Sequence, residues 1–199
     1  GMSNHLFALM RSHMPAADRT FIESTGGGTL TYGGALDLSG RIANLLVKRG
    51  VEPGDRVAVQ TEKSAEAIVL YLACIRAGAV YLPLNTAYTL TELDYFIGDA
   101  EPKVIVCSPE GKAGMEPLAR SKGVAAVETL GTGGTGSLLE EAASMPAEFA
   151  DIDRGPDDLA AFLYTSGTTG RSKGAMLSHD NLASNARTLA EFWRFTGDD

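Results

Sequence analysis

The chain has 199 residues, of which 44% are hydrophobic and 21% charged, and its formal net charge is −8. This composition is that of an ordinary globular protein and differs from those of disordered, collagenous or disulfide-rich chains. The negative charge and the lack of a Lys/Arg cluster argue against a nucleic-acid-binding surface, because such surfaces neutralise phosphates with clustered cations.

The first fifty residues alternate between helical and strand patterns. A short helix is predicted over residues 5–14 and a strand over residues 20–23, followed by a glycine-rich turn. A long helix then begins near Thr31 or Tyr32 and ends at Gly50, and its apolar residues recur near helical spacing. This part of the chain therefore supplies an amphipathic helix that packs on a sheet.

From Arg56 onward, short apolar runs alternate with helical segments. Strands are predicted over residues 56–60, 80–84, 104–107, 124–128 and 159–164. Ser64 is placed to cap a helix over residues 65–77, and Thr89 or Thr91 caps the next one. Because this alternation is typical of βα units, the expected fold class is α/β, with a parallel-rich sheet and helices on both faces.

A boundary between two subregions is expected where the sequence becomes simple and irregular. Residues 131–136 are the stretch of lowest complexity, and residues 145–156 belong to a long irregular stretch. We therefore divide the chain into an N-terminal α/β subdomain, residues 1–156, and the start of a second subregion, residues 157–199.

The last part of the chain carries one more predicted helix. After Gly174, a short apolar run over residues 175–177 leads to a helix over residues 179–195, and the sequence ends at Asp199 without a closing element. His179 is interpreted as a residue of the helix start in preference to a ligand contact.

The two cysteines and the longest apolar stretch indicate the compartment. Cys74 and Cys107 each lie inside an apolar run, which favours buried free thiols over a disulfide or a metal site. The apolar stretch over residues 65–79 is interrupted by charges and is too short to cross a bilayer. A cytoplasmic location without a membrane span is expected.

One segment, YTSGTTGRSKG, concentrates groups that bind anions. Glycine lets successive backbone N–H groups turn toward an anion, hydroxyls donate further hydrogen bonds, and lysine adds a mobile positive charge. An apolar strand precedes the segment and places it at a strand's carboxyl end, where open α/β sheets bind ligands. Its glycines, hydroxyls and cations are Thr165, Ser166, Gly167, Thr168, Thr169, Gly170, Arg171, Ser172, Lys173 and Gly174.

The glycine-rich segments allow other interpretations. A run of Gly, Thr and Ser is often only a solvated loop, but the preceding strand, the three spaced glycines and Lys173 favour phosphate binding. A Walker motif is disfavoured, because Lys173 is followed by Gly174 where that motif needs Ser or Thr. A formal G-x-G-x-x-G at Gly131, Gly133 and Gly136 suggests a dinucleotide site, but the short helix after it makes this weak.

The segment YTSGTTGRSKGAMLSHDN resembles the signature loop of the AMP-forming adenylating enzymes, which include acyl-CoA synthetases, luciferases and nonribosomal peptide adenylation domains. The upstream segments LTYGGALDLSGRIANLL, GVEPGDRVAV and GAVYLPLNTAYTLTELDYFIGDAEPKVIV follow the order and spacing of the family. The resemblance covers nearly the whole chain. Within the family, the segments PLNTAYTLTELDYFIGDAEP and TSGTTGRSKGAML look most like those of malonyl-CoA synthetases. Ser172 stands where most family members have Pro.

The resemblance implies the N-terminal portion of the large domain of an acyl-CoA synthetase. Such an enzyme joins a carboxylate to ATP, releases pyrophosphate and transfers the acyl group to coenzyme A. ATP, Mg²⁺ and CoA would serve the full enzyme, and none is expected to bind tightly to this part alone. In the loop, Lys173 would offset charge as pyrophosphate departs. The β- and γ-phosphates would be held by Thr165, Ser166, Gly167, Thr168, Thr169 and Gly170.

The resemblance also implies that the catalytic residues, the metal-binding acidic position and the C-terminal domain lie beyond Asp199, so no catalytic or metal residue is predicted within the chain. Two hypotheses remain. The chain is a fragment of an acyl-CoA synthetase that is inactive alone, or it is a free-standing module that binds a nucleotide or a partner protein. The full enzyme would take a small carboxylic acid, malonate or a fatty acid. Apolar surface left uncovered predicts self-association in both cases.

Overall fold

The computed structural model describes residues 3–23, 29–165 and 173–185. Its strands are β1 Thr20–Glu23, β2 Thr29–Thr31, β3 Arg56–Gln60, β4 Val80–Pro83, β5 Val104–Cys107, β6 Ala126–Thr129, β7 Leu159–Thr165 and β8 Lys173–Ser178. Its α-helices are α1 His5–Ser12, α2 Tyr32–Lys48, α3 Ala65–Arg76, α4 Leu90–Ala100, α5 Lys112–Ser121, α6 Ser137–Ala142 and α7 His179–Asn185, and its short 3-10 helices are η1 Pro109–Gly111 and η2 Thr132–Gly134.

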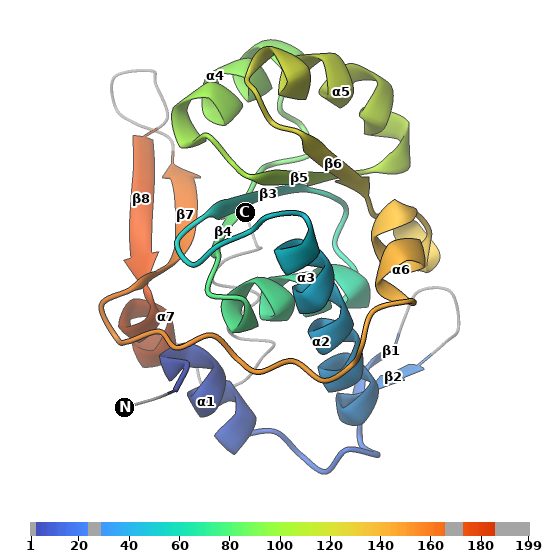
Figure 1. Cartoon of the computed structure of the whole chain (residues 1–199), viewed down its shortest axis with the longest axis vertical. Coiled ribbons are helices and arrows are strands. Elements are labelled where there is room, and N and C mark those ends of the chain that lie inside the picture. The colour runs from blue at the N-terminus through green and yellow to red at the C-terminus, as the bar shows by residue number, and fades with distance from the viewer. Residues whose placement is uncertain (1–2, 24–28, 166–172, 186–199) are drawn as a thin grey trace.

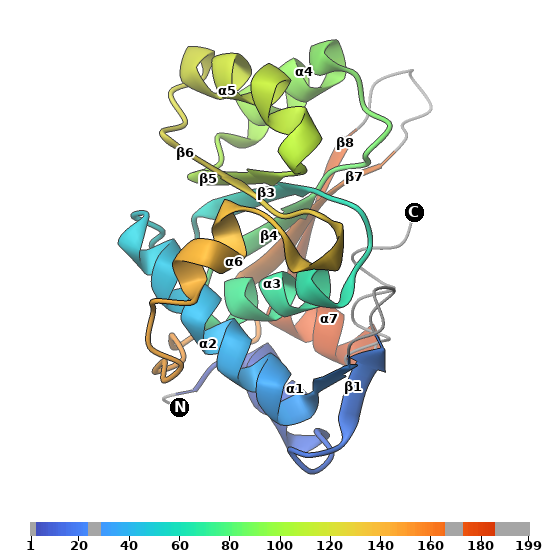
Figure 2. The same ribbon diagram turned by 90° about the vertical axis from the view of Figure 1, so that its right-hand side faces the viewer.

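A six-stranded sheet with the order β6-β5-β3-β4-β7-β8 forms the centre of the fold. Neighbouring strands run parallel except β7 and β8, which are antiparallel. Helices α4 and α5 cover one face of this sheet, and α2 and α3 lie on the other (Figures 1 and 2). The expected α/β class, with a parallel-rich sheet and helices on both faces, is confirmed.

The central strand β3 shows why the sheet is covered on both faces. Val57 and Val59 lie in the core formed with α2 and α3, whereas Ala58 lies in the separate core formed with α4 and α5. Side chains alternate between the two faces of a strand, so a strand that is buried on both faces reads as a continuous apolar run. The predicted bounds of β3 and β5 agree with the structure.

Polar side chains cap the starts of several helices. The Ser64 hydroxyl accepts a hydrogen bond from the Ala67 amide at 3.1 Å, as predicted. Thr89, and not Thr91, caps α4 in a reciprocal box with Glu92. Thr31 caps α2, so this helix begins at the next residue. These caps satisfy backbone donors that have no partner in the first helical turn.

The predicted ends of β4 and β7 differ from the structure by one residue, and three other strands differ more. The short strand β2 follows the glycine-rich turn and pairs antiparallel with β1 in a separate sheet. Strand β6 begins two residues later than predicted, because the Val124 amide still bonds to the Ala119 carbonyl at the end of α5. The run predicted only as apolar, residues 175–177, lies inside β8. Helix α7 reaches Asn185 in the described residues, and the rest of the predicted helix lies outside them.

None of the helices in the described ranges has the length and apolarity that a membrane span requires.

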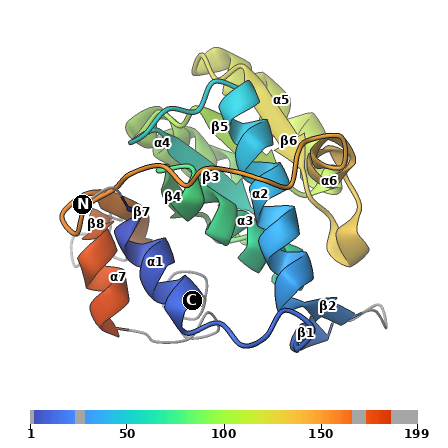
Figure 3. The ribbon, with the colours of Figure 1, turned by 60° about the horizontal axis from the view of Figure 1, so that its bottom comes forward.

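An irregular strap, defined here as residues 143–158, connects α6 to β7 across the face of α2 and α3 (Figure 3). The Asn44 side chain donates to the carbonyls of Pro146 and Glu148, both at 2.9 Å. Gly40 allows a close approach, because a Cβ at this position would lie 1.9 Å from the Ala147 carbonyl oxygen. The strap is therefore fixed to α2 through its own backbone.

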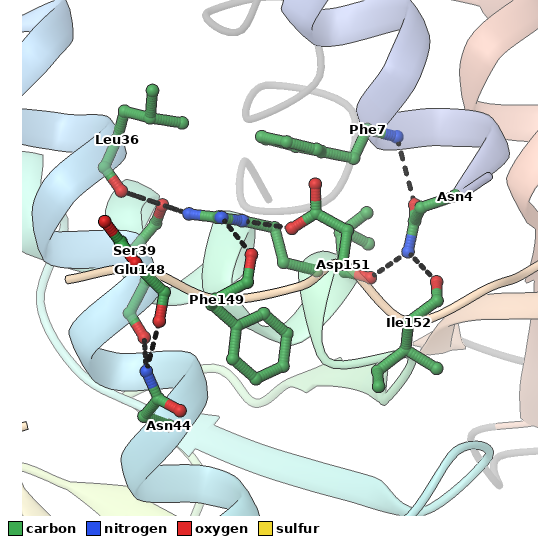
Figure 4. Close-up of polar contacts among 12 residues, drawn as sticks. Asn4, Phe7, Leu36, Ser39, Asn44, Glu148, Phe149, Asp151 and Ile152 are labelled. Carbon is green, nitrogen blue, oxygen red and sulfur yellow. Dashed lines mark hydrogen bonds and ion pairs between the residues drawn. The ribbon is translucent and has the colours of Figure 1, made fainter. Parts of the chain in front are cut away.

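The buried guanidinium of Arg76 holds the middle of the strap through Asp151 and Phe149, which Figure 4 labels. It pairs with Asp151 at 2.5 Å, donates to the Ser39 hydroxyl at 2.8 Å and to the Phe149 carbonyl at 3.1 Å. Beside it, the Asn4 amide bridges the end of α3 and the strap by donating to the Ile75 carbonyl at 2.7 Å and the Ile152 carbonyl at 2.9 Å. All three nitrogens of the Arg76 guanidinium and the amide nitrogen of Asn4 have hydrogen-bond partners, as a stable buried charge and a buried amide require.

Replacement of Arg76 by alanine is expected to lower the free energy of unfolding by about 3 kcal/mol, because it leaves Asp151 and several carbonyls without their buried partner. The control is Arg120→Ala, which removes an arginine whose side chain is 71% exposed and should change stability by less than about 0.5 kcal/mol. Urea unfolding of both variants measures the difference. Equal losses in the two variants would contradict the assigned role of Arg76.

Candidate functional site

Strands β7 and β8 form an antiparallel ribbon that leads into and out of the glycine-rich loop. The last pair in its register is Thr165 opposite Lys173, so the connecting residues 166–172 leave and re-enter the ribbon at neighbouring points. Thr165 and Lys173 are thus brought together at the backbone. The other predicted site residues, Ser166, Gly167, Thr168, Thr169 and Gly170, lie outside the described residues.

The ribbon carries this loop at the carboxyl edge of the sheet. Strand β7 runs parallel to β4, with Ala161 opposite Tyr81, and it ends at Thr165. Ligands of open α/β sheets bind outside the carboxyl ends of the strands, where the connecting loops meet. The placement of the loop at a strand end agrees with what phosphate binding requires.

Aromatic rings anchor the ribbon to α4. The ring of Tyr164 lies 4.3 Å from that of Phe96 and 4.9 Å from that of Phe162, measured between centroids. The Tyr164 hydroxyl donates to a carboxylate oxygen of Asp99 at 2.7 Å. Burial raises the pKa of Tyr164, and the hydrogen bond to Asp99 raises it further, so the hydroxyl keeps its proton. The Arg56 guanidinium lies over the Phe162 ring, 4.6 Å from its centroid.

Gly174 has a packing role that its place in the glycine-rich segment did not reveal. A Cβ at this position would lie 2.3 Å from the ring of Phe162, which belongs to the neighbouring strand of the ribbon. A glycine is therefore needed for the aromatic ring to lie across β8. The third glycine of the segment is explained by packing in the ribbon.

The second glycine motif, Gly131 to Gly136, forms a tight turn that is closed by its own contacts. The Gly131 amide donates to the Thr135 carbonyl at 2.8 Å. Gly136 has φ +111°, and a Cβ there would lie 2.4 Å from the Thr129 carbonyl oxygen. The six-residue α6 follows, and the next strand is β7, after the strap. These features fit local turn requirements and give no support to a dinucleotide site.

His179 is buried at the junction of α1 and α7. It is the first residue of α7, and its Nδ1 accepts a hydrogen bond from the Leu6 amide at 3.1 Å. Burial lowers the pKa of the imidazole to about 4, and the nearby Arg154 lowers it too. The ring is therefore neutral at pH 7. Its contacts agree with the interpretation of His179 as a residue of the helix start.

Both cysteines are buried free thiols, as predicted. Burial raises the pKa of Cys107 to about 11 and raises that of Cys74 as well, so both are protonated at pH 7. Within the described ranges, no three His, Cys, Asp or Glu side chains are grouped so that they would hold a metal ion.

Comparison with known proteins identifies relatives over most of the chain. The family described as AMP-binding enzyme matches residues 11–199. The ATP-bound crystal structure of MatB from Rhodopseudomonas palustris superimposes with a TM-score of 0.88 at 60% identity, covering 100% of this chain and 39% of MatB. The oxalate–CoA ligase of Arabidopsis thaliana is 34% identical over 92% of this chain and 36% of the ligase.

A third relative is the long-chain-fatty-acid–CoA ligase FadD13 of Mycobacterium tuberculosis, which is 28% identical over 86% of this chain and 34% of the ligase. This chain therefore spans between 34% and 39% of the length of these three relatives.

Substitution of Gly174 by alanine is expected to displace the Phe162 ring and to lower the free energy of unfolding by about 2 kcal/mol, as overpacking does. Gly155→Ala is the control, because the nearest atom to a Cβ there is 3.7 Å away. Thermal unfolding of both variants measures the effect. In a Phe162→Leu background the Gly174→Ala loss should shrink, and an unchanged loss would show that the ring is not the cause.

The buried neutral imidazole of His179 predicts a pH-dependent stability. Its folded pKa of about 4 lies below the unfolded value of about 6.5, so the unfolded chain binds the proton more readily. The resulting stability is fully present above about pH 6.5 and is lost as the pH falls toward 4. Between pH 7 and pH 5, this residue should remove about 2 kcal/mol from the free energy of unfolding.

His179→Asn tests this expectation, because asparagine keeps an acceptor near the Nδ1 position and does not titrate. Urea unfolding at pH 7 and pH 5 should show a smaller loss in the variant than in the unmodified chain. Parallel losses in the two proteins would mean that His179 does not carry the pH dependence.

Proposed function

This chain belongs to the AMP-binding enzyme family, and we propose that it is the N-terminal part of an ATP-dependent acyl-CoA synthetase. In the proposed reaction of the whole protein, a carboxylate attacks ATP to give an acyl-adenylate and pyrophosphate, and the acyl group then passes to the thiol of CoA. The relatives named as CoA ligases and the ATP-bound state of MatB support this proposal.

The observation that carries the proposal is the position of the glycine-rich loop at the end of the β7–β8 ribbon. A loop whose two ends are fixed side by side can surround an anion with backbone N–H groups and hydroxyls. In this role Lys173 supplies the positive charge that offsets the departing pyrophosphate. The β- and γ-phosphates are held by Thr165, Ser166, Gly167, Thr168, Thr169 and Gly170.

We assign a small carboxylic acid as the acyl substrate, with malonate preferred to a fatty acid. The resemblance of PLNTAYTLTELDYFIGDAEP and TSGTTGRSKGAML to malonyl-CoA synthetases supports malonate. The 34% identity to an oxalate–CoA ligase supports a short dicarboxylate in general, since oxalate and malonate both carry two carboxyl groups. Mg²⁺ and CoA complete the reactants of the whole enzyme, which we place in the cytoplasm.

The chain alone is proposed to be inactive. It spans 36% of the Arabidopsis ligase and 39% of MatB, so most of such an enzyme lies outside it. Residues 1–156 and 157–199 are assigned to the N-terminal subdomain and the start of the second subregion. Among the residues that the structure describes, strand β8 is at an edge of the sheet and its Met176 is 51% exposed, which supports self-association of the isolated chain.

Calorimetric titration of the chain with Mg-ATP tests the assigned phosphate site. Weak but saturable binding is expected. Lys173→Ala should weaken this binding about tenfold, because a charged hydrogen bond to phosphate contributes about 1.5 kcal/mol or more. The control is Lys112→Ala on α5, whose ammonium pairs with Glu116 and should leave binding unchanged.

Equal binding by the Lys173→Ala and Lys112→Ala variants would contradict the phosphate site. The same preparation should give no pyrophosphate exchange with ATP and malonate. Robust exchange would show that this chain is catalytically competent and would remove the fragment assignment.

A further inference from the structure

The carboxyl end of β7 extends past its neighbour in the parallel sheet. With Ala161 opposite Tyr81, the last residue of β4, Pro83, is level with Leu163. From Tyr164 onward the strand that pairs with β7 in the described ranges is β8. The end of the ribbon therefore projects beyond β4 beside α4, as Figures 1 and 2 show.

Two side chains of α4 contact the part of β7 that extends beyond β4. Phe96 packs against the ring of Tyr164, and Asp99 accepts the hydrogen bond from its hydroxyl. Tyr164 directly precedes Thr165, the residue that forms the last pair of the ribbon with Lys173. Contacts that hold the Tyr164 side chain therefore restrain β7 directly next to the last pair of the ribbon.

The location of Asp99 runs against the electrostatics of its helix. It lies in the last turn of α4, where the partial negative charge of the helix end disfavours a carboxylate. That turn contains no basic residue, and the cation at this helix end comes from β3, where the Arg56 guanidinium donates to the Ala100 carbonyl at 3.0 Å. A residue that breaks local rules in this way points to a compensating role elsewhere in the structure.

We propose that Asp99 is a positioning residue for ATP: through the Tyr164 hydroxyl it fixes the projecting end of the ribbon, and so the backbone of Thr165 and Lys173. The proposal rests on the phosphate-binding function proposed above and adds a residue outside the glycine-rich segment to it. The raised pKa of Tyr164 keeps its hydroxyl a donor across the neutral range.

The sign of the effect separates positioning from simple electrostatics. If charge alone mattered, removal of a negative charge from the chain would leave the binding of a polyanion unchanged or tighten it. If Asp99 positions the ribbon, Asp99→Ala should weaken Mg-ATP binding about three- to tenfold, as loss of one charge-assisted hydrogen bond does. Tyr164→Phe should weaken it equally, and the double variant should be no weaker than either single one.

Two further variants complete the titration series. Asp99→Asn keeps an acceptor for the Tyr164 hydroxyl and should bind Mg-ATP nearly as well as the unmodified chain. Asp94→Ala removes the same charge from α4 at a carboxylate that pairs with Lys122, and it should leave the affinity unchanged. Unchanged or tighter binding by Asp99→Ala, or additive losses in the double variant, would overturn the proposal.

A measurement without nucleotide separates failure of this proposal from failure of the proposed function. Amide hydrogen exchange in the ligand-free chain should be faster at residues 163–165 and 173–175 in Asp99→Ala and Tyr164→Phe, and unchanged there in Asp94→Ala. If the unmodified chain binds no Mg-ATP, the phosphate site fails, and this exchange still decides the role of Asp99. Exchange at these residues that does not change in Asp99→Ala would overturn it.

Discussion

The pairing of β7 with β4 on one side and with β8 on the other determines where the candidate site lies. Because β7 belongs to the parallel sheet, Thr165 fixes one end of the glycine-rich loop there. Lys173 in β8 pairs with Thr165 and fixes the other end beside it. The strap that enters β7 must be held in place for this pairing to form. The buried Arg76 and the amide of Asn4 hold it, because they satisfy backbone carbonyls that an irregular segment leaves without partners.

The elements that the sequence predicted well are those whose signal is local. Strands β3 and β5 are short apolar runs buried on both faces, and Ser64 precedes its helix directly, so neighbouring residues define them. Strand β8 and the path of the strap could not be found in this way. Strand β8 depends on its partner β7, and Arg76 reaches Asp151, which is 75 positions away in the chain.

In the candidate site too, features with a local sequence signal could be predicted, and features that depend on tertiary packing could not. The density of glycines, hydroxyls and cations identified the loop, because these groups are adjacent in the sequence. The role of Gly174 and the contact between Asp99 and Tyr164 depend on packing between strands and on a helix 65 positions away. The glycines from Gly131 to Gly136 show the opposite case, since a motif that suggests a ligand serves a tight turn.

The most direct test of the account is amide hydrogen exchange of the chain with and without Mg-ATP, followed by mass spectrometry of its peptides. Phosphates that are held by backbone N–H groups at the end of the ribbon should slow exchange in a peptide covering residues 163–175. Exchange in a peptide covering residues 130–137 should not change. Slowed exchange at residues 130–137, with none at the ribbon, would contradict the account.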